Sequence, residues 1–295
     1  PQIIFELQKN GGENRLVIVG MALVIIAMSF KIAIVPFHMW TPDVYTGAPT
    51  PVTGFLSAAA KAAGFAVFVR VILTGIPLGN ANWENVFWIL AVLSMTVGNL
   101  MALRQSEIKR MLAFSSIAHA GYVMVALVVG SDSAISGVIF YSLAYAVMGT
   151  GAFGILTIKD AGRVPETYDD LAGYGVRNPL QALMMTLFMF SLIGLPLTGG
   201  FIGKLQIFSA ALNNGWVWLS VIGILNSALS AYYYLRVVMF MYMREGALPE
   251  GKDLTGRSSG FALTGLIGTA MAVLYLGVFP DNIIELASSS IQALL

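Results

Sequence analysis

Long apolar stretches alternate with short polar segments along the whole chain. A helix needs about 20 apolar residues to cross a hydrocarbon core of about 30 Å, and eight stretches reach that length. The pattern of a membrane barrel, strands of about ten alternating residues, does not recur. We therefore predict an all-α polytopic membrane protein, with an amphipathic tail at 281–295 and spans at 15–47, 50–74, 83–103, 109–130, 133–158, 178–214, 215–243 and 260–279.

Two of these stretches are longer than one span requires, and each contains a helix breaker near its middle. Pro36 interrupts 15–47, and the sequence GLPLTGG, which includes Pro196, interrupts 178–214. Proline removes a backbone donor and clashes with the preceding turn. Inside lipid, a break persists only where protein or a wet cavity satisfies the freed backbone groups, so we expect both breaks to be buried in protein. Such discontinuous helices are typical of transport sites, although simple proline kinks are the alternative.

Composition agrees with a membrane protein and excludes several other classes. Only 11% of the residues are charged and 57% are hydrophobic, whereas a soluble protein has roughly 25% charged residues. The mean hydropathy is +0.80, and the net charge of +1 gives no electrostatic reason to expect a nucleic acid partner. The absence of cysteine excludes disulfides and thiolate-bound metals from this chain. Because the sequence starts with Pro1 and shows no signal peptide, we expect it to begin inside a longer protein.

The charges of the connecting segments predict an orientation. If the spans alternate in direction, one side has many basic residues and the other has only Lys9 and Arg15, with Arg70 near a span end. Lysine and arginine are enriched in cytoplasmic loops, so the basic side is expected in the cytoplasm and both ends of this chain outside it. The basic side carries Arg104, Lys109, Arg110, Lys159, Arg163, Arg177, Arg244, Lys252 and Arg257.

Three lysines, Lys31, Lys61 and Lys204, lie far from any span end. A lysine at a helix centre costs about 2.5–3.5 kcal/mol on insertion scales, which favours a functional reason for each of them. Lysine and arginine near a span end can instead extend to the interface, which suffices for Arg70 and Arg236. It explains Lys61 poorly, because that residue lies mid-span among small neighbours, on one helix face with Thr53 and Ser57.

A histidine in the fourth span is the natural relay partner of these lysines. His119 lies near the middle of that span, with Ser115 and Ser116 four and three residues before it and Tyr122 three residues after it. Histidine changes its charge near neutral pH, which suits proton transfer, whereas a structural histidine bonded to a backbone carbonyl is the alternative. Buried charges are normally paired. Because the acidic residues lie at span ends or in loops, the partner of a lysine is expected to be Asp43, a residue upstream of Pro1, or a neighbouring subunit.

Four stretches carry a resemblance to a known family. The chain is similar to the antiporter-like membrane subunits of the proton-pumping NADH:quinone oxidoreductases (respiratory complex I), and PFHMWTPDVYTGAP favours the subunit N type over its sister subunits. The histidine of IAHAGY favours a bacterial subunit over the chloroplast type. The stretches are FKIAIVPFHMWTPDVYTGAPTPVTGFLSAAAKAAG (30–64), GNLMALRQSEIKRMLAFSSIAHAGY (98–122), SLIGLPLTGGFIGKLQIF (191–208) and SAYYYLRV (230–237).

The resemblance implies a fold and a site. It implies two inverted repeats, each with one broken helix. Residues 1–74 would hold the last two spans of the first repeat, 83–243 the second five-helix repeat, and 260–295 the final span and the amphipathic helix. Lys31 would pair with a glutamate that is not in this sequence, Lys61 would be the central proton carrier, His119 would connect two half-channels, and Lys204 would end the second. The expected supporting residues are Pro36, His38, Asp43, Ser115, Ser116, Tyr122 and Pro196.

The implied function is proton translocation in a bacterial inner membrane, coupled to quinone reduction in other subunits. No cofactor or metal is expected in this chain, since flavin, iron–sulfur clusters and quinone would belong to partner subunits. The expected partners are the antiporter-like subunit M, small membrane subunits and the lipid bilayer. A subunit of a multisubunit sodium/proton antiporter is the alternative, and a quinone-binding or purely structural membrane subunit is a third hypothesis.

Overall fold

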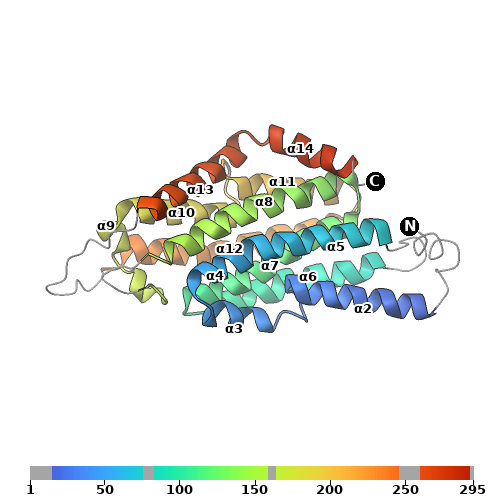
Figure 1. Ribbon diagram of the computed structural model, residues 1–295, viewed down its shortest axis with the longest axis horizontal. Helices are drawn as coiled ribbons and strands as arrows, with labels where there is room; N and C mark the ends of the chain where they lie inside the picture. The colour runs from blue at the N-terminus through green and yellow to red at the C-terminus, as the bar shows by residue number, and fades with distance from the viewer. Residues whose placement is uncertain (1–14, 76–82, 159–163, 246–259, 293–295) are drawn as a thin grey trace.

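The computed structural model describes residues 15–75, 83–158, 164–245 and 260–292. Within these ranges the chain is helical, and most helices run side by side along the longest axis of the molecule (Figure 1). The elements are α2 (Arg15–Ile32), α3 (Trp40–Gly47), α4 (Thr50–Phe55), the π-helical turn η1 (Leu56–Ala60), α5 (Lys61–Gly75), α6 (Trp83–Leu103), α7 (Ile108–Val129), α8 (Asp132–Ile155), the 3-10 turn η2 (Asp169–Leu171), α9 (Tyr174–Arg177), α10 (Pro179–Ile193), α11 (Gly199–Asn213), α12 (Val217–Met243), α13 (Gly260–Val278) and α14 (Asp281–Gln292).

The structure confirms the predicted fold class. Six described helical spans are long and apolar enough to cross a membrane, and their bounds agree within a few residues with six of the predicted spans. The two remaining predicted spans are the broken ones, and their halves are shorter: α10 and α11 have 15 residues each. The six complete spans are Thr50–Ile72, Trp83–Leu103, Ile108–Val129, Asp132–Ile155, Val217–Met243 and Gly260–Val278.

Helix α7 is enclosed by its neighbours, and 94% of its most apolar window is buried. Glycines allow α6 to approach it closely. A Cβ atom at Gly98 would lie 2.7 Å from the backbone nitrogen of Ala118, and one at Gly121 would lie 2.6 Å from the nitrogen of Met95. Because α7 is buried on all sides, its polar residues must find partners on the surrounding helices.

The first break separates α2 from α3, as Pro36 predicts. Its freed backbone groups are satisfied by neutral donors and acceptors. The Val35 amide donates to the hydroxyl of Ser94 on α6 at 3.0 Å, and the Trp40 indole donates to the Phe30 carbonyl at 3.0 Å. The Ile34 amide donates to the Ser29 carbonyl at 2.9 Å. The chain therefore leaves α2 with these backbone groups hydrogen-bonded.

The second break lies between α10 and α11 and begins at Gly194, whose φ of +89° is left-handed. The amides of Gly194 and Leu195 both donate to the Phe190 carbonyl at 3.0 Å, which closes the last turn of α10. The Gly200 amide at the start of α11 donates to the Ser191 hydroxyl at 3.2 Å. Both discontinuous helices predicted from the sequence are therefore present.

Burial of the breaks was predicted correctly for the helix ends and wrongly for the prolines. Ile32 and Ile193, the last residues of α2 and α10, are buried, whereas Pro36 and Pro196 are exposed on the described chain. The physical reason is that the freed carbonyl groups belong to the helix ends. Proline has no N–H group that would require a partner, so burial of its ring is not needed.

A third irregularity was not predicted. The turn η1 joins α4 to α5 within the span Thr50–Ile72 and ends immediately before Lys61. Single π-helical turns widen a helix locally and are frequent at functional sites. Thr53, Ser57 and Lys61 are all buried, as their predicted common face requires.

The first residues of α2 and the end of α14 lie at the same end of the bundle, at the right in Figure 1. The junction of α6 with α7 and the end of α12 lie at the opposite end. Part of the orientation argument falls on residues outside the described ranges, namely Lys9, Lys159, Arg163, Lys252 and Arg257. Residues 1–14 and 293–295 of the predicted repeat and tail also lie outside them.

Candidate functional site

Lys61 lies at the start of α5 with only 5% of its surface exposed. Its Nζ atom donates to two oxygens of Ser116 on α7, the carbonyl at 2.5 Å and the hydroxyl at 3.0 Å. The Ser116 hydroxyl in turn donates to the carbonyl of Ala113 at 2.8 Å. The ammonium group is thus held against a helix backbone by charge-assisted hydrogen bonds, with no carboxylate among these contacts.

His119 lies one helical turn beyond Ser116 and is enclosed by tyrosines. Its Nδ1 atom is 2.5 Å from the hydroxyl of Tyr141 on α8, and its Nε2 atom is 2.9 Å from the hydroxyl of Tyr234 on α12. The Tyr234 hydroxyl also makes a short hydrogen bond with the Ser115 hydroxyl. A tyrosine hydroxyl both donates and accepts, so either neutral form of the ring, or the doubly protonated ring, can be hydrogen-bonded here. The arrangement suits a group that gains and loses protons.

Lys204 on α11 reaches back across the second break, and only 5% of its surface is exposed. Its Nζ atom donates to the carbonyl oxygens of Leu192 at 2.9 Å and Ile193 at 2.8 Å, and to the hydroxyl of Ser227 at 2.9 Å. An ammonium group has three N–H donors, and here all three have an acceptor. The negative end of the α10 dipole favours this positive charge. Within the described chain, two helix-end carbonyls and one hydroxyl therefore stabilise the charge of Lys204.

Tyr122 lies between His119 and Lys204. Its ring meets the His119 ring edge to face with centroids 5.5 Å apart, and the Lys204 Nζ atom lies 4.9 Å from its centroid. A buried amide holds the tyrosine: Asn99 Nδ2 donates to the Tyr122 hydroxyl at 3.3 Å, and the Tyr233 hydroxyl donates to Asn99 Oδ1 at 2.8 Å. Aromatic and polar groups thus occupy the interval between the two candidate proton carriers.

The structure does not bring Lys31 into this line of contacts. Lys31 is in the last turn of α2, where the helix dipole favours a cation, and its side chain is exposed on the described chain. Its stem lies near α5, because a Cβ atom at Gly64 would be 3.6 Å from Lys31 Cγ. Pairing of Lys31 with a glutamate stays a prediction.

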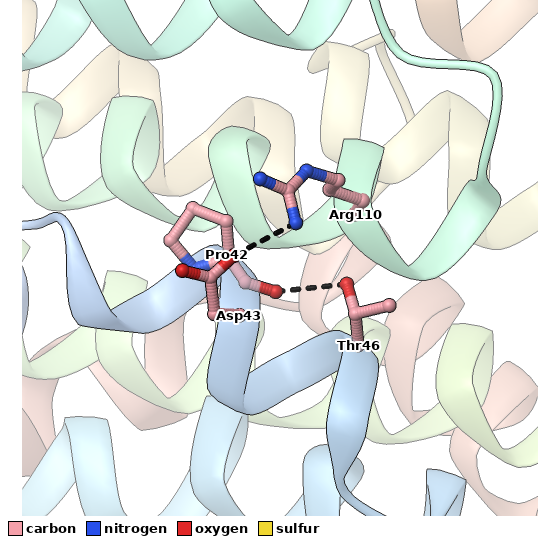
Figure 2. A network of polar contacts seen from close by, with 4 residues as sticks. All are labelled: Pro42, Asp43, Thr46 and Arg110. Atoms are coloured by element: carbon pink, nitrogen blue, oxygen red, sulfur yellow. Dashed lines mark hydrogen bonds and ion pairs between the residues drawn. The ribbon is translucent and has the colours of Figure 1, made fainter.

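Asp43 was one of three expected partners for a membrane lysine, and the structure pairs it differently. Its Oδ1 atom lies 2.9 Å from Nη1 of Arg110, at the start of α7 (Figure 2). The neighbouring Lys109 donates to the carbonyls of Thr46 at 3.0 Å and Ala48 at 3.1 Å, at the end of α3. Two consecutive basic residues thus fix α3, the segment after the first break, to the helix that carries His119.

His38 is buried in the first break, and its Nδ1 atom has no hydrogen-bond partner among the described residues. Pro36 and Pro196 lie in the two helix breaks, and the side chains of both are exposed on the described chain. Their contribution is to interrupt the helix. Sequence reasoning missed Tyr141, Tyr234 and Ser227, which were interpreted as parts of apolar spans. A hydroxyl inside an apolar span is their only local signal.

The sequence of this chain matches one protein family and several curated proteins. The family described as "NADH:quinone oxidoreductase/Mrp antiporter, TM" matches residues 2–230. NADH-quinone oxidoreductase subunit N of Trichlorobacter lovleyi is 49% identical over 286 residues, which cover 97% of this chain and 58% of that protein. The chain therefore spans less than two thirds of the length of this relative.

Solved structures share the fold. A chain of respiratory complex I from Thermus thermophilus with bound aureothin is 35% identical, with a TM-score of 0.78 over 92% of this chain and 60% of that one. A chain of the Mrp complex from Dietzia sp. has a TM-score of 0.85 over 94% of this chain and 59% of that one, and at 22% identity it shows the fold alone. The chain belongs to the NADH:quinone oxidoreductase/Mrp antiporter family of membrane proteins, and its curated relatives are N subunits of NADH-quinone oxidoreductases.

Proposed function

We propose that this chain is a proton-translocating part of subunit N in a bacterial NADH:quinone oxidoreductase. The observation that carries the proposal is the buried polar line through the bundle centre. Lys61 donates a hydrogen bond to Ser116. His119 lies one turn further along α7, between the hydroxyls of Tyr141 and Tyr234. The ring of Tyr122 contacts both His119 and the Nζ atom of Lys204. Ionisable groups inside membrane spans mark proton or ion pathways.

The proposed roles follow from these contacts. Lys61 takes up a proton and is held by Ser116 while charged. His119 passes a proton by exchanging donor and acceptor roles with the hydroxyls of Tyr141 and Tyr234. Lys204 receives a proton at the end of α10, and its release leaves two N–H donors for the three acceptors around Nζ. Lys31 would form the entrance step with a glutamate from outside this sequence.

The break positions support a two-repeat organisation, with 1–74 in the first repeat, 83–243 in the second, and 260–295 as the final span and amphipathic helix. We further propose that flavin, iron–sulfur clusters and quinone bind to other subunits, and that subunit M and small membrane subunits are neighbours in the bilayer. The basic ends of α6, α7 and α12 support a cytoplasmic location for that side and an outer location for both ends of this chain.

A sodium/proton antiporter subunit is the alternative. The likeness to the Mrp complex supports only the shared fold, whereas the sequence relatives are N subunits. Copurification with peripheral flavin and iron–sulfur subunits would favour the oxidoreductase, and their absence would favour the antiporter.

Lys61→Ala in the intact complex tests the proposal. The variant should assemble, because small neighbours surround the site and a membrane lysine is costly. Proton uptake into vesicles and the coupled quinone reductase rate should fall strongly. Lys61→Arg should not restore them fully, since arginine stays charged. Arg70→Ala, on the same helix α5, is the matched control and should pump normally. Normal pumping by correctly assembled Lys61→Ala would show that Lys61 is structural.

A further inference from the structure

An open groove of about 950 Å³ follows the outer face of α12 toward the C-terminal end of that helix. On a helix, residues spaced by three and four positions share one face, and the apolar lining of the groove has this spacing. In a membrane such a face contacts lipid chains or a neighbouring helix, so the charged residues of the groove decide which of the two it fits. The apolar lining, exposed on the described chain, consists of Tyr232, Leu235, Met239, Tyr242 and Met243.

Two arginines of this groove, Arg236 and Arg244, place their guanidinium groups beside the same aromatic ring. The Cζ atom of Arg236 lies 5.7 Å from the ring centroid of Phe240, and the Cζ atom of Arg244 lies 4.9 Å from it. Arg236 also lies over the ring of Tyr168, at 4.2 Å from its centroid. Aromatic faces attract cations, so these rings hold the two guanidinium groups in place. Two positive charges are thereby gathered within a mainly apolar groove.

The hydrogen-bonding capacity of these two groups is largely unused within the described chain. A guanidinium group has five N–H donors, and the described acceptor of Arg236 is the Gln105 carbonyl at 3.4 Å. Neither arginine forms an ion pair with a carboxylate of the described residues, whereas Arg110, also on the basic side of the bundle, lies 2.9 Å from Asp43. A single arginine near a span end extends to the interface without needing a partner. Two arginines that converge on one ring repel each other, and an anion between them removes that repulsion.

We propose that this groove binds an anionic phospholipid, with its phosphate at Arg236 and Arg244 and an acyl chain along Tyr232, Leu235 and Met239. Guanidinium groups bind phosphate oxygens through paired hydrogen bonds. Anionic lipids are enriched in the cytoplasmic leaflet, which is the side proposed for the basic ends of α6, α7 and α12. A neighbouring helix would cover the apolar lining equally well, but it would need a carboxylate at this depth to pair with the arginines. The inference goes beyond proton translocation and does not depend on it.

The test uses the purified complex in detergent and a photoactivatable phosphatidylglycerol, with the label counted on peptides from α12. Unlabelled phosphatidylglycerol and zwitterionic phosphatidylcholine are compared as competitors. The variants are Arg236→Gln, Arg244→Gln and the double variant. Arg244→Gln is the least able to disturb folding, because Arg244 is exposed and follows the last residue of α12. Arg110→Gln is the matched control, since that arginine has a carboxylate partner of its own.

We expect half-maximal labelling of α12 to require about fivefold more lipid in each single variant, and more in the double variant, because each basic residue near a bilayer surface strengthens the binding of anionic lipid by about that factor. Arg110→Gln and Lys61→Ala should label normally, so the result is separate from the test of the proposed function. Phosphatidylcholine should compete poorly.

Equal competition by the two lipids, or unchanged labelling of the double variant, would overturn the lipid site. A density map of the complex is the second measurement. It should show a phosphate beside Arg236 and Arg244, whereas a carboxylate of a neighbouring subunit in that place would overturn the proposal and make the groove a contact between subunits.

Discussion

The Nζ atom of Lys204 lies 2.8 Å from the carbonyl oxygen of Ile193, the last residue of α10. A lysine from the second half of a broken helix therefore caps the first half. A hydrogen bond from a charged donor contributes about 1.5–3 kcal/mol, so the protonation state of this one side chain is coupled to the order of the break. At the first break the partners are neutral: the Trp40 indole donates to the Phe30 carbonyl, and the Ser94 hydroxyl accepts from the Val35 amide.

Replacement of Lys204 by methionine should loosen the end of α10 at the second break and lower proton uptake. The side chain keeps its approximate length but loses its three donors, so the Leu192 carbonyl loses the Lys204 donor and the Ile193 carbonyl keeps only the Ser227 hydroxyl. We expect faster hydrogen exchange at the amides of Gly194 and Leu195, and a fall in proton uptake of at least about tenfold. Overall stability should change little, because removal of a membrane lysine offsets the lost hydrogen bonds.

Lys109→Met is the matched control for that variant, because Lys109 also donates to two helix-end carbonyls, at the end of α3. It should increase hydrogen exchange near α3 and leave proton uptake close to normal. Equal loss of pumping in both variants would mean that helix capping alone, and not a titrating lysine, explains the effect of Lys204→Met.

Gly194→Ala should disturb the same place through the backbone. The φ of Gly194 is +89°, which costs a residue with a Cβ atom about 1–2 kcal/mol, and that Cβ would lie 3.0 Å from Lys204 Cδ. Gly215→Ala provides the comparison, because its φ is +84° and a Cβ atom there has no neighbour within 4 Å. Both variants should lower the thermal unfolding midpoint, but only Gly194→Ala should lower proton uptake. Equal effects on pumping would contradict a specific contact with Lys204.

Much of the fold was predictable because its signals are local. Apolar length marks the spans, and Pro36 and Gly194 mark the two interruptions. The burial of Lys61, His119 and Lys204 followed from their positions within the spans. These properties depend on the chain near each residue, so a sequence without any alignment contains them.

The partners of these residues were not predictable, because they come from other helices. Among the described residues, Lys204 donates to the carbonyls of Leu192 and Ile193 and Lys61 donates to Ser116, whereas a carboxylate partner upstream of Pro1 or from a neighbouring subunit stays a prediction. A backbone acceptor leaves no residue type to recognise. Tyr141 is a hydrophobic residue by composition, and only the packing of α8 against α7 directs its hydroxyl to His119. The turn η1 also lacks a local signal, since alanine suits an α-helix equally well.

Removal of either tyrosine hydroxyl beside His119 should slow proton transfer without unfolding the protein. Tyr141→Phe and Tyr234→Phe each leave one ring nitrogen of His119 without its hydrogen-bond partner. We expect proton uptake to fall by about tenfold in each, and the assembled complex to remain. Tyr168→Phe is the control, since that hydroxyl is buried without a hydrogen-bond partner among the described residues. Normal proton uptake in both Tyr141→Phe and Tyr234→Phe would show that His119 is not part of the proton path.

The ion pair between Asp43 and Arg110 should contribute little to stability or pumping. Their side chains are 74% and 36% exposed, and exposed ion pairs contribute about 0.2–1 kcal/mol. We expect Asp43→Asn and Arg110→Met each to shift the unfolding midpoint slightly, with proton uptake near normal. The loss of unfolding free energy in the double variant should be no larger than the sum of the losses in the two single variants. If Asp43→Asn abolished pumping while assembly and stability stayed normal, Asp43 would be a partner of a membrane lysine after all, and the pairing with Arg110 would be one of two states of this carboxylate.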